Sequence, residues 1–480
     1  MDILFLQNIW FESLGAMSLV AAARKAGFKA DIVIGKDKDL LKEVNRSKPR
    51  FVAFSTVTGT QLWAHQLCEH IKKEISSDIT TIMGGPHPTF FPEILSHSSY
   101  LDMICVGEGE YVLPEILAVE KIPDDIQHVE NIHVKIGGQI IRNPVRPLIE
   151  DLDSLPFVNR ESLYRYPLIK DNPIKRLISS RGCPHNCAFC FNHSMKKLYK
   201  GKGAYIRRRS VDNVIDEMKA LKKRWPVETF LFEDDQFAVN KTWLLEFCDK
   251  YAKNFDLPFI CYARADSIDD ETVKALKDAG CYNVVIGVET GDERLRNEIL
   301  NKNITDAQLK EAAALFHKYK INFCTTNILG LPNETLEQAF RTVTFTWELN
   351  PTFTWCSVFQ PYPRTELGDM VLAEKLVPHL DVDAIEPNYH SNSVLQQPAI
   401  RQSVNLHKFF YILFNYPALF PLIKPLLKWP PNVVFTLIHR ISFLFIYRKR
   451  WKISLWRALQ EGFNTSGFTR KKRVKRSNDT

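Results

Sequence analysis

The sequence lacks both a secretory signal and a membrane-spanning run. No basic segment or small-residue cleavage site follows Met1, so we expect the chain to remain in a reducing cytoplasm. The longest uncharged stretches, 409–423 and 429–439, fall short of the roughly 20 apolar residues that a spanning helix needs. With 480 residues, 45% hydrophobic and 25% charged, the composition excludes a disordered chain and predicts two or three globular domains.

Acidic residues are nearly absent from the end of the chain. Residues 440–480 contain twelve lysines and arginines but only Glu461 and Asp479, whereas the whole chain has a net charge of +8. The preceding residues are therefore close to neutral, and the basic character belongs to the tail.

A fourth cysteine is missing where cysteines cluster. The stretch RGCPHNCAFC holds Cys183, Cys187 and Cys190, and the other seven cysteines are dispersed through apolar segments. Clustered cysteines in a reducing compartment indicate a metal site. Zinc bound by these three and His193 is one alternative, although structural zinc sites usually combine two separated ligand pairs. We favour an iron–sulfur cluster held by three thiolates, because its fourth iron stays open to another group.

The first part of the chain alternates short apolar runs with amphipathic ones. DILFLQ, ADIVIG, FVAFST, TTIMGG and DMICVG have the pattern of strands, with helical segments between them. This predicts an α/β domain, a Rossmann-like doubly wound parallel sheet whose ligands bind at the carboxyl ends of the strands. We assign residues 1–125 to this domain, and the proline-rich residues 126–172, with a small hairpin at Gly137 and Gly138, to a linker.

The alternation returns with longer helices after residue 173. Six strands with five intervening helices describe a partial (β/α)6 barrel of the TIM type, with its chemistry at the C-terminal strand ends. The cysteine cluster follows the first of these strands. We assign residues 173–368 to the barrel and 369–480 to a helical, aromatic-rich and basic C-terminal region. The strands are expected near 174–180, 228–233, 258–263, 283–288, 321–328 and 352–359, and the helices near 211–224, 241–253, 270–279, 303–319 and 334–348.

The spacing C-x3-C-x2-C, with the aromatic Phe189 before the last cysteine, resembles the signature of the radical S-adenosylmethionine enzymes. In that superfamily the open iron of a [4Fe–4S] cluster binds S-adenosylmethionine, and an electron from the cluster cleaves it to a 5′-deoxyadenosyl radical. The resemblance implies that Cys183, Cys187 and Cys190 hold the cluster and that Phe189 lies beside the cofactor.

Later segments resemble further elements of this superfamily and imply more cofactor contacts. Each has a plainer explanation, such as an acidic helix start for FLFEDDQF or a local ion pair between Arg264 and Asp266. Their order along successive strand ends supports the cofactor interpretation. The residues implied are Glu233 or Asp234 near the amino group of S-adenosylmethionine, Arg264 and Glu289 near its ribose or carboxylate, and Gly330 and Glu334 beside its adenine.

The N-terminal domain resembles the latter part of a cobalamin-binding fingerprint. Ser55 to Val57 follow a strand, and Gly84 and Gly85 follow after a spacing of 26 residues. The resemblance implies that these two turns approach the nucleotide tail of cobalamin. The fingerprint's D-x-H-x-x-G is absent, because Glu12 stands where its histidine would be, so we expect no histidine ligand to cobalt.

The combined resemblance spans about residues 1–370 and implies a cobalamin-dependent radical enzyme. We favour a methyltransferase acting on an unactivated carbon or phosphorus of a small or lipophilic substrate, with an external flavodoxin- or ferredoxin-like electron donor. A radical cyclase or rearrangement enzyme with the same cofactors, similar to the tetrapyrrole ring cyclases, is one alternative. A methylthiotransferase acting on transfer RNA is another, but that class carries three further N-terminal cysteines where this chain has Cys68 and Cys105. We therefore do not expect nucleic acid as a partner.

The C-terminal region matches no motif. Residues 406–452 are rich in aromatic and aliphatic side chains, which five prolines interrupt. An apolar face beside cations predicts either a cap packed on the barrel or a peripheral contact with the inner membrane face. We expect weak affinity for an anionic membrane surface.

Overall fold

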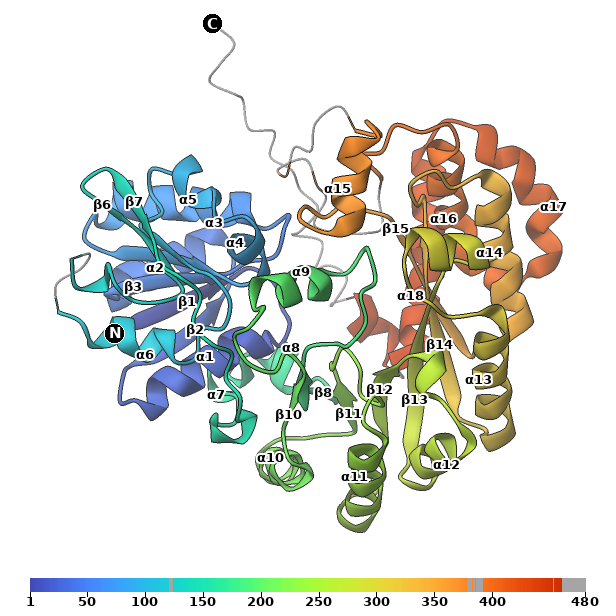
Figure 1. Ribbon diagram of the computed structural model, residues 1–480, viewed down its shortest axis with the longest axis horizontal. Helices are drawn as coiled ribbons and strands as arrows, with labels where there is room; N and C mark the ends of the chain where they lie inside the picture. Colours follow the sequence, from blue (N-terminus) through green and yellow to red (C-terminus); the bar gives the residue numbers. More distant parts are fainter. Residues whose placement is uncertain (121–123, 378–381, 383–384, 386–391, 452, 460–480) are drawn as a thin grey trace, which may run out of the picture.

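The computed structural model describes residues 1–120, 124–377, 382, 385, 392–451 and 453–459. Two α/β units lie side by side, and helices of the C-terminal region pack on the second unit (Figure 1). The basic segment 460–480 lies outside the described residues. Within those residues, no helix is both long and apolar enough to cross a membrane.

The N-terminal unit is the expected doubly wound sheet. Its first five strands are parallel, in the order β2-β1-β3-β4-β5. Apolar side chains on both faces are buried, one face under α1 and α6 and the other under α2 and α3. The elements are β1 (Ile3–Gln7), α1 (Leu14–Lys25), β2 (Ala30–Ile34), α2 (Asp37–Ser47), β3 (Phe51–Ser55), α3 (Gln61–His70), β4 (Thr80–Gly84), α4 (Pro86–Phe90), α5 (Ile94–His97), β5 (Met103–Cys105) and α6 (Val112–Ala118).

The hairpin that we expected in the linker belongs to this sheet. Strands β6 (Ile132–Ile136) and β7 (Gln139–Arg142) flank Gly137 and Gly138, and β6 pairs antiparallel with β5. An unpaired β5 would leave a row of backbone groups exposed at the sheet edge, so the hairpin completes the sheet. Short helices α7 (Glu161–Tyr164) and α8 (Pro167–Lys170) then lead to the barrel.

The second unit is a curved sheet of six parallel strands in the order β15-β14-β13-β12-β11-β8. Its strands and helices match the expected segments closely, because each helix carries one buried stripe and each strand a buried apolar run. The additional ribbon β9–β10 and helix α9 carry the cysteine segment between β8 and α10. The elements are β8 (Ile174–Leu177), β9 (Ser180–Arg181), α9 (Phe191–Leu198), β10 (Arg207–Arg208), α10 (Val211–Arg224), β11 (Thr229–Phe232), α11 (Lys241–Asn254), β12 (Phe259–Ala263), α12 (Asp270–Asp278), β13 (Cys281–Glu289), α13 (Asp306–Tyr319), β14 (Asn322–Leu329), α14 (Leu336–Leu349) and β15 (Phe353–Val358).

Capping residues fix where the later barrel helices begin. Thr305 precedes α13, and its hydroxyl accepts from the backbone N–H of Gln308, whose own side chain accepts from the Thr305 N–H. Thr335 and Gln338 repeat this capping box at α14. Both helices therefore start at a fixed residue after the strand ends that face the site.

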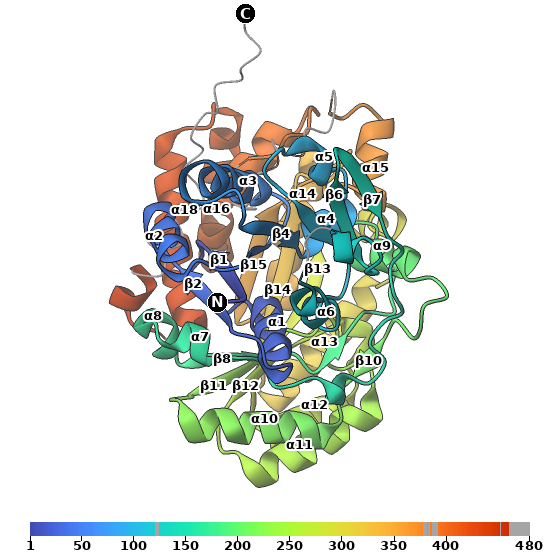
Figure 2. The ribbon, with the colours of Figure 1, turned by 90° about the vertical axis from the view of Figure 1, so that its left-hand side faces the viewer.

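The C-terminal helices close the open side of the barrel between β15 and β8. α16 packs on β15 and α14, and α18 lies beside α16 (Figure 2). The ring of Phe443 lies 5.1 Å from that of Trp355 on β15, and Arg457 donates to the Asp171 carbonyl after α8 at 2.6 Å. The cap that the sequence offered as an alternative is therefore present. The helices are α15 (Glu366–Ala373), α16 (Ile400–Asn415), α17 (Phe420–Ile423) and α18 (Val433–Trp451).

A buried charge network joins the two units. The Glu12 carboxylate, 4% exposed, accepts from Arg160 at 2.9 Å, from the backbone N–H of Arg176 at 3.1 Å and from the Tyr164 hydroxyl. Arg160, 3% exposed, also donates to the Arg176 carbonyl at 2.6 Å and pairs with Glu217 on α10. Glu12 thus ties the loop after β1 to the linker and to the first barrel strand.

We predict that Arg160→Met lowers the free energy of unfolding by about 3–5 kcal/mol, because it leaves two buried carboxylates without their shared cation. Chemical denaturation followed by circular dichroism measures the change. The control is Arg46→Met, which removes an exposed ion pair with Glu43 on α2 and should leave stability unchanged. Equal effects of the two variants would contradict a structural role for the network.

Candidate functional site

A cavity of about 490 Å³, here called the main cavity, lies where the strand ends of the two units face each other. Ser55 and Gly85 line it from the N-terminal sheet, and Ser180, Glu233 and Asp235 line it from the barrel. A side cavity of about 40 Å³ continues from Ser55 and Gly85 into the apolar interior of the N-terminal unit. Ligands bind at the strand ends of both fold types, and expected residues of both units, Ser55, Gly85 and Glu233, line this one cavity. The three clustered cysteines, Arg264, Glu289, Gly330 and Glu334 are not among its lining residues.

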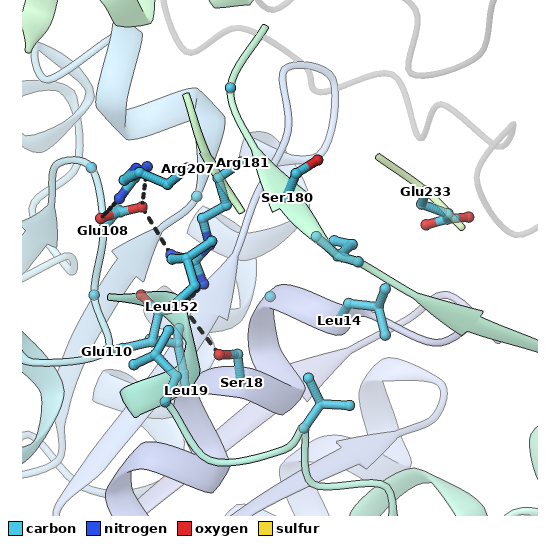
Figure 3. A pocket seen from close by; sticks show the side chains of 18 of the residues that line it. Leu14, Ser18, Leu19, Glu108, Glu110, Leu152, Ser180, Arg181, Arg207 and Glu233 are labelled. Atoms are coloured by element: carbon cyan, nitrogen blue, oxygen red, sulfur yellow. Dashed lines mark hydrogen bonds and ion pairs between the residues drawn. The ribbon is translucent and has the colours of Figure 1, made fainter. Parts of the chain in front are cut away.

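Ion pairs between the two units form one wall of the main cavity (Figure 3). Glu108 accepts from both terminal nitrogens of Arg207 at 2.9 Å and from Arg181 at 2.9 Å. Glu110 accepts from Arg181 at 2.5 Å and from the Ser18 hydroxyl at 3.1 Å. We call these groups the interdomain latch. Because Arg181 stands two residues before Cys183, the latch positions the start of the cysteine segment.

The three clustered cysteines lie together in the segment between β9 and α9. Each is a half-buried free thiol, and the Cys190 N–H donates to the Cys187 carbonyl at 3.0 Å. Ala188 between them donates to the Leu300 carbonyl and accepts from the Leu367 N–H, both at 2.9 Å. The segment is thus anchored to the loop after β13 and to the start of α15.

Polar groups surround the sulfur atoms. A terminal nitrogen of Arg264 lies 3.7 Å from Cys187 Sγ, and the side-chain amide of Asn192 lies 3.6 Å from Cys190 Sγ. Burial raises the pKa of the Cys190 thiol to about 11, so metal ligation has to displace its proton. Donors to cluster sulfurs tune iron–sulfur sites, and three thiols with such neighbours fit a cluster.

The zinc alternative finds no support. Within the part of the chain that the structure describes, no three histidine, cysteine, aspartate or glutamate side chains lie close enough to bind one metal ion. Among these residues His193 is not grouped with the cysteines. A [4Fe–4S] cluster has no such requirement, because its thiolates bind different irons.

The acidic segment after β11 divides into three roles. Asp234, 2% exposed, accepts from the Ser179 N–H at 3.1 Å, the Ser179 hydroxyl at 2.7 Å and the Ser180 hydroxyl, so it is occupied by protein groups. Glu233 lines the main cavity and pairs with Arg176. Asp235, which the sequence did not single out as a ligand, also lines the cavity, and burial raises its pKa.

Two further residues expected near S-adenosylmethionine, Arg264 and Glu289, form ion pairs with other protein side chains. Arg264 pairs with Asp266 at 2.8 Å and donates to the Lys302 carbonyl at 2.7 Å while it faces Cys187. Glu289 ends β13 with a φ of 65° and pairs with Lys302. Both lie at strand ends on the cysteine side of the barrel, as expected.

Gly330 and Glu334 form one turn after β14. Gly330 has a φ of +74°, and its N–H donates to the Glu334 carboxylate at 2.6 Å. Burial raises the pKa of Glu334 to about 8. The Glu334 carboxylate therefore stabilises the turn. A ligand at this turn would contact its backbone atoms and not the Glu334 side chain. Phe189 packs with Ala188, Leu300 and neighbouring apolar side chains.

The two N-terminal turns lie in direct contact. The Thr56 N–H donates to the Gly84 carbonyl at 2.9 Å, and Val57 is 48% exposed. Gly85 has a φ of 92° and a ψ of −170°, a region open in practice only to glycine, and a Cβ there would lie 2.8 Å from the Thr56 oxygen. The turns that hold Ser55, Val57, Gly84 and Gly85 thus lie side by side, and their contact with cobalamin stays a prediction.

We predict that Gly85→Ala lowers the free energy of unfolding by at least about 2 kcal/mol, because a methyl group forces the Ser55–Thr56 turn to move. The control is Gly84→Ala, where a Cβ would meet only Cys105 at an ordinary 3.8 Å. Urea denaturation of both variants compares them directly. A neutral Gly85→Ala would contradict the close packing of the two turns.

Comparisons with known proteins agree with this division. A family model described as B12 binding domain matches residues 11–117, and one described as Radical SAM superfamily matches residues 177–346. An uncharacterized methyltransferase of Pyrococcus horikoshii is 28% identical over 71% of this chain and 73% of its own. An anaerobic magnesium-protoporphyrin IX monomethyl ester cyclase of Rubrivivax gelatinosus is 28% identical over 74% of this chain and 66% of its own.

The fold is that of a solved cobalamin-dependent radical enzyme. The structure of OxsB with aqua-cobalamin and S-adenosylmethionine bound has a TM-score of 0.67 and 18% identity, and covers 93% of this chain and 72% of its own. The two matched domains imply a [4Fe–4S] cluster, S-adenosylmethionine and cobalamin as cofactors. The chain combines a B12-binding domain with a radical SAM domain, and it belongs to the radical S-adenosylmethionine enzymes that carry a cobalamin-binding domain.

Proposed function

We propose that this chain is a cobalamin-dependent radical S-adenosylmethionine methyltransferase acting on an unactivated carbon or phosphorus of a small or lipophilic substrate. One observation carries the proposal: the main cavity is bounded by the Ser55–Gly85 rim on one side and by the start of the cysteine segment on the other. A methyl carrier on the first side and a radical source on the second would meet the substrate between them.

Cys183, Cys187 and Cys190 are the proposed cluster ligands. Their half-buried thiols, the anchoring of Ala188 and the donors on Arg264 and Asn192 support this assignment. Glu233, Arg264, Glu289 and the Gly330–Glu334 turn are the proposed surroundings of S-adenosylmethionine, and Asp235 joins them from the cavity wall. Phe189, which packs on the cluster of Ala188 and Leu300, remains a proposed neighbour of the cofactor. The Asp234 carboxylate is held by Ser179 and Ser180, so its proposed contribution is to fix the strand ends.

The Ser55–Val57 and Gly84–Gly85 turns are the proposed seat of cobalamin. The side cavity, which is lined by apolar groups beside Ser55 and Gly85, has only about 40 Å³, so the N-terminal unit would have to open there to admit a nucleotide tail. Glu12 cannot serve as a lower cobalt ligand, since Arg160, Tyr164 and Arg176 use its carboxylate.

When bound, the cluster would reduce S-adenosylmethionine to yield a 5′-deoxyadenosyl radical, and cobalamin would carry the methyl group. The chain's own groups orient the cofactors and exclude water. Leu14, Leu152 and Phe157 line the cavity with apolar surface, which shields a reactive radical from solvent. An external flavodoxin- or ferredoxin-like protein is the proposed electron source. All ten cysteines are free thiols, which suits a reducing cytoplasm.

The two relatives support two reactions of this kind. A methyltransferase and a cyclase match the chain over similar lengths, so a radical cyclase with the same cofactors is the second candidate. The transfer-RNA alternative is not favoured, because Cys68 and Cys105 lie buried in the N-terminal sheet unit and bring no further cluster site.

We predict that Cys187→Ala abolishes the charge-transfer absorption of the cluster and the reductive cleavage of S-adenosylmethionine, because one iron loses its protein ligand. Iron analysis of anaerobically purified protein measures cluster loading. The control is Cys68→Ala. Cys68 is a buried cysteine of α3 that does not line the main cavity, so this variant should keep the charge-transfer absorption and the cleavage of S-adenosylmethionine. A variant lacking all three clustered thiols that retained normal iron would overturn the assignment.

We predict that 5′-deoxyadenosine and S-adenosylhomocysteine form together in comparable amounts, because one S-adenosylmethionine supplies the radical and another supplies the methyl group. The enzyme is incubated anaerobically with dithionite, methyl-deuterated S-adenosylmethionine and a metabolite extract, and mass spectrometry follows the label. Full 5′-deoxyadenosine formation without S-adenosylhomocysteine, and without bound cobalt, would exclude the methyltransferase and leave only a radical S-adenosylmethionine activity that does not use cobalamin.

A further inference from the structure

The outward side of α18 is apolar. Val434, Leu437, Ile441 and Phe445 are 63%, 55%, 48% and 56% exposed, and their spacing of three or four residues places them on one side of the helix. We call them the outer face of α18. A soluble surface helix normally turns polar side chains toward water, so a stripe of this kind marks an interaction site.

The orientation of the helix is fixed by packing on its other side. Phe435, His439 and Ile446 are buried, and the Phe435 ring lies 4.8 Å from that of Phe409 on α16. Helix α18 packs on α16, which itself packs on β15 (Figure 2). Packing on the buried side therefore fixes which side of α18 is exposed to solvent.

Large apolar side chains extend the surface beyond both ends of the helix. Trp429, just before α18, is 56% exposed. After the helix, Leu455 and Trp456 are 41% and 71% exposed. Tryptophan is enriched where proteins meet the interfacial region of a bilayer, because its ring is apolar and its N–H is polar.

Charge of one sign surrounds this surface. From residue 387 to residue 460 the chain has no aspartate or glutamate. Lys428, Arg440, Arg448 and Lys449 are exposed next to the apolar stripe, and none of them forms an ion pair among the described residues. The surface thus combines exposed apolar groups with uncompensated positive charge.

We propose that the outer face of α18 docks on an anionic lipid bilayer, with the helix lying in the plane of the interface. Apolar side chains would enter the acyl boundary while the cations contact lipid phosphates, as in peripheral amphipathic helices. A second copy of the chain fits less well, because a twofold interface would bring the same cations face to face. This inference does not depend on which reaction the enzyme performs.

The docking surface belongs to the helix that closes the barrel. Phe443 and Arg450 of α18 contact Trp355 on β15, with the Arg450 guanidinium 5.7 Å from the indole ring. A bilayer on the outer face would therefore lie one helix away from the barrel wall. This placement would suit a lipophilic substrate that partitions into the bilayer.

Vesicle cosedimentation tests the proposal with the full-length holoenzyme. We expect binding to vesicles of phosphatidylcholine and phosphatidylglycerol in equal parts, and much weaker binding to phosphatidylcholine alone. Raising the salt concentration should weaken the binding, because exposed charges are screened. Absence of binding to the anionic vesicles, or equal binding to both, would overturn the proposal.

Matched variants test the surface itself. Phe445→Asp should reduce affinity for the anionic vesicles about tenfold or more, and Arg448→Ser with Lys449→Ser should reduce it similarly. Leu372→Asp is the control, because Leu372 on α15 is 38% exposed outside this surface. Circular dichroism checks that each variant is folded. Unchanged binding of Phe445→Asp, or a dimer in analytical ultracentrifugation that this variant dissociates, would assign the face to another partner.

Discussion

Buried pairing of opposite charges between the two units is the interaction on which the site depends. Glu108 and Glu110 belong to the N-terminal sheet unit, whereas their partners Arg181 and Arg207 belong to the barrel. Glu12 of the N-terminal unit pairs with Arg160 of the linker and accepts from the backbone N–H of Arg176 on β8. Taking such groups out of water is costly unless each finds several partners, and here each carboxylate accepts at least two hydrogen bonds. The cavity exists only when both units are folded, because each supplies one half of these pairs.

The position of Glu12 illustrates how one substitution in a binding motif changes its use. A histidine there would offer a ring nitrogen to a metal, whereas the glutamate is directed into a buried network with Arg160 and Tyr164. In this chain the residue at that position therefore stabilises the contact between the N-terminal unit and the linker. Its charge is held where a cation from the linker and a backbone N–H from β8 converge.

Local patterns in the sequence predicted the strands, the helices and the cysteine segment, since each depends on neighbouring residues. Long-range pairings were not predictable in that way. Nothing near FLFEDDQF distinguishes Asp234, which Ser179 and Ser180 occupy, from Asp235, which faces the cavity. The sequence places the hairpin after residue 131 in a linker, because its pairing with the edge strand β5 depends on residues distant in the chain. The motif ICVGEGE is glycine-rich and acidic, a signal for a turn, yet its partners Arg181 and Arg207 lie more than 70 residues away.

The helices that cover the side of the barrel are synthesised after all of its strands. The barrel strands leave the ribosome from β8 to β15, whereas α18 comes close to the C-terminus. Domains fold as they emerge, from the N-terminal end first. The side of the barrel beside β15 therefore stays uncovered until α16 and α18 have been synthesised. During that interval the apolar side chains of β15 that α16 later buries face water, and the barrel is then most open to association with other chains.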